Sequence, residues 1–333
     1  MKALVYTQPK EMQLQERPMP ELVAGEVVLR IEAVGICGSD MHAWHGHDPR
    51  RQPGLVLGHE FVGRIDRSAA PGFEPGSRWT GNPLIVCGTC EYCVQGRNNL
   101  CANRTMVGMT RPGAYAEYMS IPAASLVALP QDMPTVAAAL TEPAATAWHA
   151  INLSMRALAR PLHECRVLVI GGGAIGMLAS LLLVHLGVRH LSVTELNPKR
   201  RETLARAVGC ETIDPRSQPL ADSRHDFVID AVGSKVTREQ AFRTIKPGAV
   251  VMHVGLQDWA SEIDMRKLTL AEITLLGTYT YTTADLRATV DALHRGVFGD
   301  LAWVEERRLA EGPQAFVDLD RGDSAAAKIV LRA

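Results

Sequence analysis

Side chains that bind metals and carry protons are concentrated between residues 37 and 60. Cys37 is followed by Ser39 and His42, and His59-Glu60 comes after a polar loop. A thiolate, an imidazole and a carboxylate are suitable ligands for Zn²⁺. Ser39 and His42 add a short proton carrier and a group that titrates near neutral pH. For a Cys or a His taken alone, the alternative is an ordinary buried side chain.

Four further cysteines form the clearest motif in the chain. Cys87, Cys90, Cys93 and Cys101 follow the spacing C-x2-C-x2-C-x7-C. Four thiolates close a tetrahedral site with no open position, so the motif predicts a structural zinc. An iron–sulfur cluster or a redox switch is the alternative, although Ala102 stands where ferredoxin-type motifs have proline.

Rigid elements have to position these ligands. The alternating segment 25–34 predicts a strand that runs directly into Cys37, and the β-rich segment 54–63 holds His59 and Glu60. The region up to residue 140 is predicted to be mainly β, with irregular loops and a strand over 113–119. A helix is predicted from Pro134, and Glu142 precedes a proline that begins the next helix. Glu142 is therefore either a partner of the helix dipole or a functional group.

The pattern changes after residue 166. The apolar run 167–170 predicts a buried parallel strand, and Gly171 to Gly176 then opens an apolar helix with the pattern G-x-G-x-x-G. Glu195 ends the next predicted strand, 24 residues after Gly171. Between a strand and a helix, this pattern is typical of a dinucleotide site whose carboxylate binds ribose. The glycines allow a pyrophosphate to approach the helix N-terminus.

Strands and helices continue to alternate along the second half. Strands over 227–232, 249–254 and 273–277 and helices over 199–208 and 235–244 predict a doubly wound parallel sheet. Ligands bind at the carboxyl ends of such strands, so Val232, Gly255 and Thr278 are candidate neighbours of a nicotinamide. An α/β domain that no longer binds nucleotide is the alternative. A helix over 284–295, another over 313–319 and a strand over 327–331 follow, and the strand is expected to join the N-terminal sheet.

Composition excludes several classes of partner. The chain has 35 basic and 36 acidic residues and no long run of one sign, so nothing indicates nucleic acid or an anionic membrane surface. Residues 167–188 carry no charge, but glycines leave only 174–188 as continuous helix, which is short for a bilayer. The N-terminus turns polar too early for a signal peptide. Seven cysteines without an export signal predict a reducing, cytoplasmic location, with Cys165 and Cys210 as ordinary buried or partly buried thiols.

The order of these motifs resembles the zinc-dependent medium-chain dehydrogenase/reductase family, and within it the polyol branch of sorbitol, threonine and galactitol-phosphate dehydrogenases. The resemblance implies an α/β fold. A Rossmann coenzyme domain with a doubly wound parallel sheet would span residues 148–283. A mainly β, GroES-like catalytic domain would span 1–147, completed by 284–333.

The resemblance also implies roles for individual residues. Cys37 and His59 would bind the catalytic zinc, with Glu60 as a further or exchangeable ligand. Glu142 would bind it directly or through water. Ser39 and His42 would form a proton relay by way of the cofactor ribose. The residues expected at the cofactor are Gly171, Gly173, Ala174, Ile175, Gly176, Glu195, Arg200, Val232, Gly255 and Thr278.

The expected function is a zinc-dependent NAD(H) oxidoreductase that interconverts a polyol or secondary alcohol and its ketone. It would carry two zinc ions per chain and form a homodimer or homotetramer, with no nucleic acid or membrane partner. Glu195 favours NAD over NADP, because a carboxylate repels a 2′-phosphate, although Arg200 could soften this preference.

Alternatives remain open. The substrate could be an amino alcohol such as threonine, or a sugar phosphate. A non-catalytic NAD-binding redox sensor could use the cysteine cluster as its switch. The presence of Cys37, His59 and Glu60 argues against that sensor and against a zinc-free relative that resembles quinone reductases. His45 and His47 indicate either a further metal site or, preferably, an exposed loop.

Overall fold

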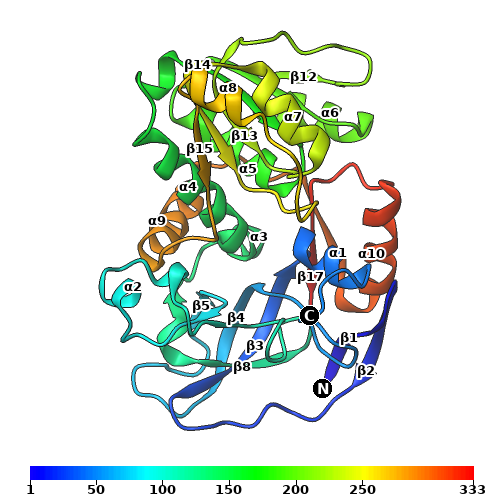
Figure 1. Ribbon diagram of the computed structural model, residues 1–333. Helices are drawn as coiled ribbons and strands as arrows, with labels where there is room; N and C mark the ends of the chain where they lie inside the picture. The colour runs from blue at the N-terminus through cyan, green and yellow to red at the C-terminus, as the bar shows by residue number, and fades with distance from the viewer. The chain divides into compact units, whose positions relative to one another are not determined.

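The computed structural model describes residues 1–333, which divide into two units (Figure 1). The first unit contains Met1–Pro143, Thr282–Gly296 and Val304–Ala333. The second contains Ala144–Tyr281 and Val297–Trp303. The C-terminal segment therefore returns to the unit that the N-terminal segment begins.

The first unit is built on a mainly antiparallel sheet of seven strands in the order β16-β17-β3-β4-β5-β9, with β8 also paired to β3. Two smaller sheets pair β1 with β2 and β6 with β7. The strands are β1 Lys2–Gln8, β2 Glu11–Glu16, β3 Glu26–Gly35, β4 Glu60–Ser68, β5 Arg78–Gly81, β6 Leu84–Ile85, β7 Thr105–Met106, β8 Tyr118–Pro122, β9 Leu126–Ala128, β16 Val304–Arg308 and β17 Lys328–Arg332. The helices are α1 Gly38–Trp44, α2 Glu91–Val94, α3 Thr135–Ala139, α9 Thr283–His294 and α10 Gly312–Arg321.

Strand β3 is the centre of this unit. Its residues alternate between the two faces, and Val27, Leu29, Ile31 and Val34 belong to the buried core. Strand β17 pairs with it antiparallel, as the sequence predicted for the closing strand. Because β3 ends at Gly35, the chain enters Cys37 and α1 from a strand held on both sides.

The second unit is one parallel sheet of six strands in the order β12-β11-β10-β13-β14-β15. This is the Rossmann strand order, in which the third strand of the unit, β12, lies at one edge and its sixth strand, β15, at the other. The strands are β10 Arg166–Ile170, β11 His190–Thr194, β12 Glu211–Ile213, β13 His225–Asp230, β14 Ile245–His253 and β15 Thr274–Gly277. The fold class expected from the sequence is thereby confirmed.

Helices lie before and between these strands, as in a doubly wound sheet. They are α4 Thr141–Met155, whose first turn belongs to the first unit, α5 Ala174–His185, α6 Pro198–Val208, α7 Lys235–Thr244 and α8 Met265–Leu270. Helix α5 packs on β10 and β11, and α7 packs on β13 and β14. Helix α5 is buried over most of its length, which explains its nearly uninterrupted apolar sequence.

Some elements differ from the sequence prediction. The strand expected over 113–119 begins only at Tyr118, because Gly113 and Tyr115 donate their backbone N–H groups to Val56 and Leu57 instead of to a regular ladder. The short strands β12 and β16 and helix α8 were not predicted, because so few residues show no periodicity.

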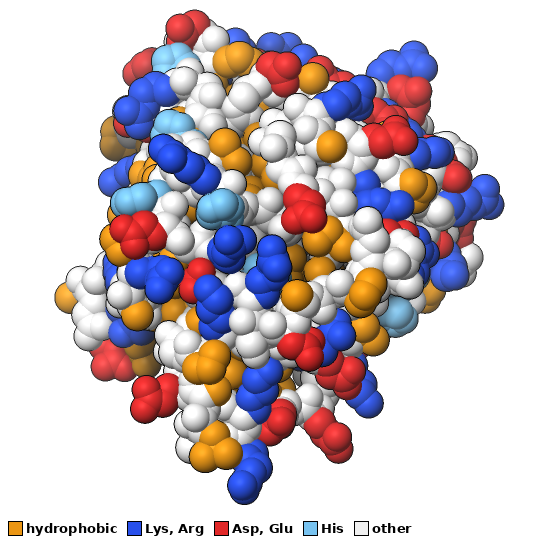
Figure 2. Space-filling model, turned by 90° about the horizontal axis from the view of Figure 1, so that it is seen from above, with side chains coloured by type: hydrophobic (Ala, Val, Ile, Leu, Met, Phe, Trp, Pro, Cys, Tyr) orange, Lys and Arg blue, Asp and Glu red, His pale blue; other side chains and the backbone are white.

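Charge is mixed over the surface, and the helices are short or polar. In Figure 2, acidic and basic side chains are interspersed over the face shown, as the formal net charge of −1 suggests. None of the helices combines the length and the apolar character that crossing a membrane requires.

Candidate active site and metal centres

Three metal-binding side chains meet where β3 ends and β4 begins. Cys37 precedes α1, and Gly35 of β3 pairs with Glu60, the first residue of β4. One ligand atom from each of Cys37, His59 and Glu60 lies within 4.8 Å of the others. A thiolate, an imidazole and a carboxylate at this spacing fit a zinc ion, and His59 and Glu60 are buried. These residues could therefore hold a catalytic zinc that leaves a position for substrate.

Strand pairing leaves no room for a side chain opposite Glu60. A Cβ atom at Gly35 would lie 2.0 Å from Oε2 of Glu60. Glycine at this position therefore lets the Glu60 carboxylate lie against β3 beside the other donors. Gly35 therefore shapes the site, although it carries no functional group.

Asp40 contacts two of the metal-binding residues, Cys37 and His59. It is completely buried, and its Oδ2 accepts hydrogen bonds from the Tyr115 hydroxyl at 2.7 Å and from the Cys37 amide at 3.1 Å. Its Oδ1 lies 3.5 Å from Nδ1 of His59. This is an ion-pair contact and not a hydrogen bond, since neither atom has a hydrogen-bond partner, and its charge favours one orientation of the His59 ring.

Asp40 and Cys37 together set the charge of His59 when no metal is bound. Burial lowers the pKa of His59, but the charges of Asp40 and Cys37 outweigh it, so the pKa is raised well above its usual value. Burial opposes ionisation of Asp40, yet His59 and Arg51 hold its pKa below the usual range. Zinc would have to displace the proton from His59, so its binding should release protons.

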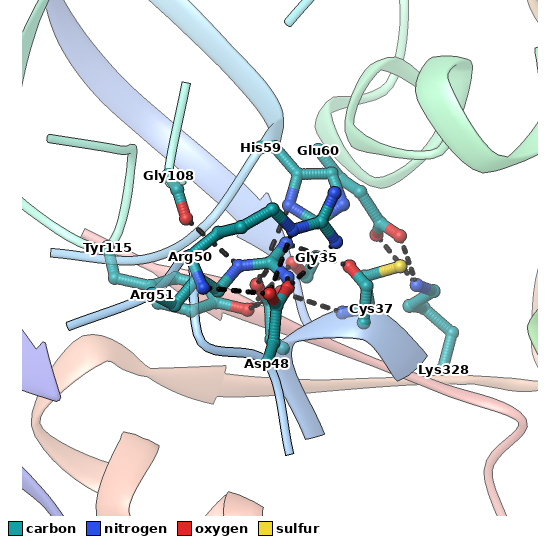
Figure 3. Close-up of polar contacts among 12 residues, drawn as sticks. Gly35, Cys37, Asp48, Arg50, Arg51, His59, Glu60, Gly108, Tyr115 and Lys328 are labelled. Atoms are coloured by element: carbon teal, nitrogen blue, oxygen red, sulfur yellow. Dashed lines mark hydrogen bonds and ion pairs between the residues drawn. The ribbon is translucent and has the colours of Figure 1, made fainter. Parts of the chain in front are cut away.

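Glu60 is held by a lysine from the far end of the chain (Figure 3). Lys328 of β17 donates to Oε1 and Oε2 of Glu60 at 2.6 and 2.7 Å and to the Ile36 carbonyl at 2.8 Å. Burial lowers the pKa of Lys328, but the charges of Glu60 and Cys37 raise it above its usual value. The Glu60 carboxylate is therefore paired with a cation that the chain itself supplies.

Glu142 lies in the first turn of α4, which the sequence predicted to begin near this residue. It is 6% exposed, so it is a buried carboxylate. It is not part of the cluster formed by Cys37, His59 and Glu60. Its charge nevertheless acts on Lys328, so it belongs to the same electrostatic environment.

Ser39 and His42 both lie on α1, three residues apart and therefore on neighbouring positions of one helix face. The Ser39 hydroxyl accepts a hydrogen bond from Arg51 at 3.1 Å. Burial lowers the pKa of His42, and nearby His47, His45 and Arg51 lower it further, against the opposite effect of Asp48. His42 is therefore neutral at pH 7 and can accept a proton.

His45 and His47 do not add a further metal cluster. Their rings stack with centroids 5.4 Å apart, and Nε2 of His45 lies 2.7 Å from Oδ1 of Asp320. His47 is exposed, in accord with the preferred prediction of a surface loop. The only clusters of three or more metal-binding side chains in residues 1–333 are those at Cys37 and Cys87.

The four clustered cysteines come together around α2 and the turn that follows it. One Sγ atom from each of Cys87, Cys90, Cys93 and Cys101 lies within 4.8 Å of the others, and Cys101 is fully buried. All seven cysteines of the chain are free thiols. Backbone N–H groups of Thr89 and Cys90 lower the pKa of Cys87 to about 5, whereas burial raises that of Cys93 to about 12. Four sulfurs at these distances fit a closed zinc site.

We expect Cys90→Ser to act on stability and not on the chemical step. The variant should bind one zinc fewer per chain and should be cleaved faster by protease between residues 87 and 101, because the loop is short of regular structure. Metal content, limited proteolysis and kcat check this on one preparation. A variant that keeps its stability and loses activity would contradict the structural role.

The dinucleotide motif of the second unit forms the expected turn between β10 and α5. Gly171 has a φ of +95°, which glycine adopts readily, and a Cβ atom at Gly176 would lie 1.8 Å from the Gly171 carbonyl oxygen. Beside Gly173, by contrast, a Cβ atom would meet nothing within 4 Å. Gly173 is the N-cap of α5, and no side chain caps the helix there. Its open helix N-terminus, with Ala174 and Ile175 in the first turn, fits a pyrophosphate.

Glu195 lies just beyond β11, beside this turn. Its Oε2 accepts from the Gly172 amide at 2.9 Å, and its Oε1 accepts from the Asn197 amide at 2.7 Å. The carboxylate is thereby oriented next to the glycines, where a ribose hydroxyl could contact it. Arg200 lies in the first turn of α6, and its Nε is buried without a hydrogen-bond partner.

Three further predicted cofactor neighbours follow the ends of β13, β14 and β15. A Cβ atom at Gly255 would lie 2.1 Å from the carbonyl carbon of Val232, so these two segments are in contact. Thr278 directly follows β15, and its buried hydroxyl has no hydrogen-bond partner. An unpartnered buried hydroxyl at the carboxyl end of a parallel strand is available to a ligand.

Sequence reasoning missed four residues of the first-unit site. Asp40, Arg51, Tyr115 and Lys328 support or surround the metal donors. Asp40 stands within the Cys37 motif and could have been found by its position. The others have no local signal, and Lys328 lies 268 residues from Glu60.

Comparison with known proteins agrees with this arrangement. Residues 23–131 match the family model for the alcohol dehydrogenase GroES-like domain, and residues 174–295 match that for zinc-binding dehydrogenases. The chain is 34% identical to an L-threonine 3-dehydrogenase of Chelativorans sp. (strain BNC1) over 84% of this chain and 83% of that protein.

Solved structures agree with the same class. A zinc-binding dehydrogenase from Sinorhizobium meliloti bound to NADP superimposes with a TM-score of 0.87 at 28% identity, covering 100% of this chain and 99% of that one. Acetophenone reductase from Geotrichum candidum in complex with NAD gives a TM-score of 0.89 at 27% identity, covering 100% and 97%. The chain belongs to the zinc-dependent medium-chain dehydrogenase/reductase family, and is an oxidoreductase of that type.

Proposed function

We propose that this protein is an NAD(H)-dependent dehydrogenase that interconverts a secondary alcohol or polyol and its ketone. The observation that carries the proposal is the cluster of half-buried Cys37 with buried His59 and Glu60, whose ligand atoms lie within 4.8 Å of one another. Zinc held by these residues would supply a Lewis acid for the substrate oxygen. Glu142 would complete the ligand set, directly or through water.

The chain's own residues would orient and move the proton of the reaction. Ser39 would take the proton that the alcohol oxygen loses, and His42 would pass it to solvent. Asp40 would hold His59 in one orientation through the contact at 3.5 Å. Neutral His42 suits this role, because only the uncharged imidazole can accept a proton.

The second unit would bind the cofactor through Gly171, Gly173, Ala174, Ile175 and Gly176. Glu195 supports NAD over NADP, since its carboxylate would accept ribose hydroxyls and repel a 2′-phosphate. The NAD complex of acetophenone reductase and the NADP complex from Sinorhizobium meliloti show that similar folds accept either cofactor. We propose that the catalytic residues lie in 1–147 and 284–333 and the cofactor residues in 148–283, close to the observed division at Pro143 and Tyr281.

A second candidate is an amino alcohol dehydrogenase. The observation that favours it is the 34% identity to an L-threonine 3-dehydrogenase. Both candidates use the same metal and cofactor chemistry, so they differ only in the groups that flank the reacting carbon.

The test is a substrate panel under anaerobic conditions. Polyols, secondary alcohols, amino alcohols and sugar phosphates would each be tried with NAD and NADP, and zinc would be counted on the same sample. Two zinc ions per chain and NADH formation from one class would support the proposal and select between its two forms. One zinc ion and no turnover with any class would overturn it in favour of a non-catalytic sensor.

The pH dependence should report His42. Its lowered pKa means that protonation, and with it loss of alcohol oxidation, should occur only below about pH 6.5, the usual pKa of histidine. His42→Gln should lower kcat for oxidation by about 10²-fold and remove this acidic limb. The exposed neighbour His47 supplies the control: His47→Gln should retain the rate and an acidic limb, and the limb should move to higher pH because His47 helps to lower the pKa of His42. A limb that persists unchanged in His42→Gln would assign it to another group.

We also propose a homo-oligomer formed through the second unit. Strand β15 is the last strand of its sheet and pairs only with β14, and Trp259, Leu270 and Leu275 near it are exposed. Open strand edges beside apolar side chains tend to be covered by another chain. Sedimentation should show a dimer or tetramer, and Leu275→Glu should shift it toward the monomer. We further propose a cytoplasmic setting, because four of the seven cysteines form one metal-binding cluster and no two are joined in a disulfide.

A further inference from the structure

Arg51 is an almost fully buried arginine of the first unit, and the proposed mechanism has so far given it no role. Its side chain is 1% exposed. Arginine is rarely buried unless it is paired, because its charge loses hydration that partners must replace. The partners of Arg51 therefore indicate what its burial accomplishes.

Each arm of the guanidinium has a different partner, and Figure 3 labels two of them, Asp48 and Gly108. Nη1 donates to Oδ2 of Asp48 at 2.6 Å, and Nε donates to the Gly108 carbonyl at 3.2 Å. Nη2 donates to Oγ of Ser39 at 3.1 Å and lies 4.0 Å from Oδ1 of Asp40. Asp48, which Arg51 shares with Arg50, is the close ion-pair partner, and the third arm contacts the serine hydroxyl.

This contact defines which way the Ser39 hydroxyl can act. A guanidinium has five N–H donors and no acceptor, so Ser39 must accept from it and cannot donate to it. The hydroxyl donates to no other atom of residues 1–333, and Ser39 is only half-buried. The hydrogen bond from Arg51 therefore occupies one lone pair of Oγ. The second lone pair and the hydroxyl proton remain free to bond to a substrate or to another relay group.

We propose that Arg51 is the positioning residue of the proton relay: it holds Oγ of Ser39 so that its remaining lone pair faces the substrate alcohol. This rests on the proposed dehydrogenase function. In oxidation, the substrate O–H bond breaks and its proton bonds to Oγ, while the original Ser39 proton leaves toward His42. The carbinol hydrogen departs as hydride with its electron pair and reduces NAD⁺, so Ser39 ends each turnover with the bonds it began with.

A planar fork is needed for this task. Lysine could keep the ion pair with Asp48, but a single ammonium at the end of a flexible chain cannot also hold Ser39 in place. Arg51→Lys therefore separates the buried charge from the hydrogen bond to Ser39. Arg50 supplies a matched control, because it is exposed and donates to the same Asp48 at 2.8 and 3.0 Å without contacting Ser39.

The test is a double-mutant cycle with Ser39→Ala. We expect Arg51→Lys to lower kcat by about tenfold or more, with the KM for NAD⁺ and the zinc content unchanged. In the Ser39→Ala background, Arg51→Lys should change kcat by less than about twofold, because its target is already absent. Arg50→Lys should behave as wild type in both backgrounds. The solvent deuterium isotope effect on kcat should rise in Arg51→Lys only.

Three results would overturn the role of Arg51. The losses of Arg51→Lys and Ser39→Ala could multiply, which would show that the residues act independently. Arg51→Lys could lose zinc, which would place its effect at His59 through Asp40. It could also retain full kcat.

A second cycle separates this inference from the proposed function. Thermal unfolding of the four zinc-free proteins measures the Arg51–Ser39 contact without turnover, and coupled shifts in Tm are expected. Additive shifts would show that the contact does not form in the protein. Coupled shifts in a protein that oxidises nothing on the substrate panel would overturn both the dehydrogenase function and the relay role, leaving a structural contact.

Discussion

Cys37→Ser should abolish turnover and leave NADH binding near that of wild type. The thiolate is the one soft ligand in the Cys37, His59 and Glu60 cluster, and serine does not ionise near neutral pH to replace it. Loss of the metal removes the charge that stabilises the substrate oxygen, so we expect kcat to fall by at least about 10³-fold. NADH binding should survive because its predicted contacts lie in the second unit.

The measurements are NADH fluorescence titration, zinc content and kcat on the same preparation. Zinc should fall from two ions to one, since the Cys87 cluster is untouched. Cys210→Ser is a suitable control, because Cys210 is half-buried and belongs to neither cluster. A folded Cys37→Ser protein that no longer binds NADH would argue against the assignment of the two roles to separate units.

Lys328→Met should be among the most destabilising single substitutions in the first unit. It would leave Glu60 buried and unpaired, which typically costs about 3–5 kcal/mol of unfolding free energy. The cost should be greater without zinc than with it, because a bound cation can take over part of the charge of Glu60. Chemical denaturation of the zinc-loaded and zinc-free proteins measures both values.

The same strand offers a matched control for this prediction. Arg332 of β17 pairs with Glu306 at 2.8 Å, but both side chains are over 40% exposed, at 42% and 44%. Arg332→Met should therefore cost less than about 1 kcal/mol. Adding Glu60→Gln to Lys328→Met should recover stability, because the orphaned charge is then gone. Equal effects of the two single variants would show that burial does not govern the Lys328–Glu60 pair.

These predictions divide between what local sequence reveals and what it does not. The family, the two metal motifs and the Rossmann sheet were predicted, and the fold class and family are confirmed by the structure and by the comparisons. Each depends on residues close in sequence: four cysteines within residues 87–101, or a strand followed by G-x-G-x-x-G. Short-range spacing constrains the backbone directly, so such motifs can be recognised without a structure.

The strands that failed to be predicted show the limit of periodicity. Strand β12 has three residues and pairs with β11 through tertiary contact, with too few positions to show alternation. The segment from Gly113 to Tyr115 alternates like a strand but bonds irregularly to Val56 and Leu57. Propensity describes a residue's preference, whereas the partner strand decides whether a ladder forms.

By itself, the sequence determined the donors for two metal sites, the dinucleotide turn and the class of chemistry they can perform. Only the tertiary structure decided how the donors are supported: Lys328 on Glu60, Asp40 on His59, and Arg51 on Ser39. The physical reason is that motif ligands are spaced by local backbone geometry, which is written in consecutive residues. Buried charges are instead neutralised by whichever side chain the fold brings within hydrogen-bond distance, and for Glu60 that side chain comes from the other end of the chain.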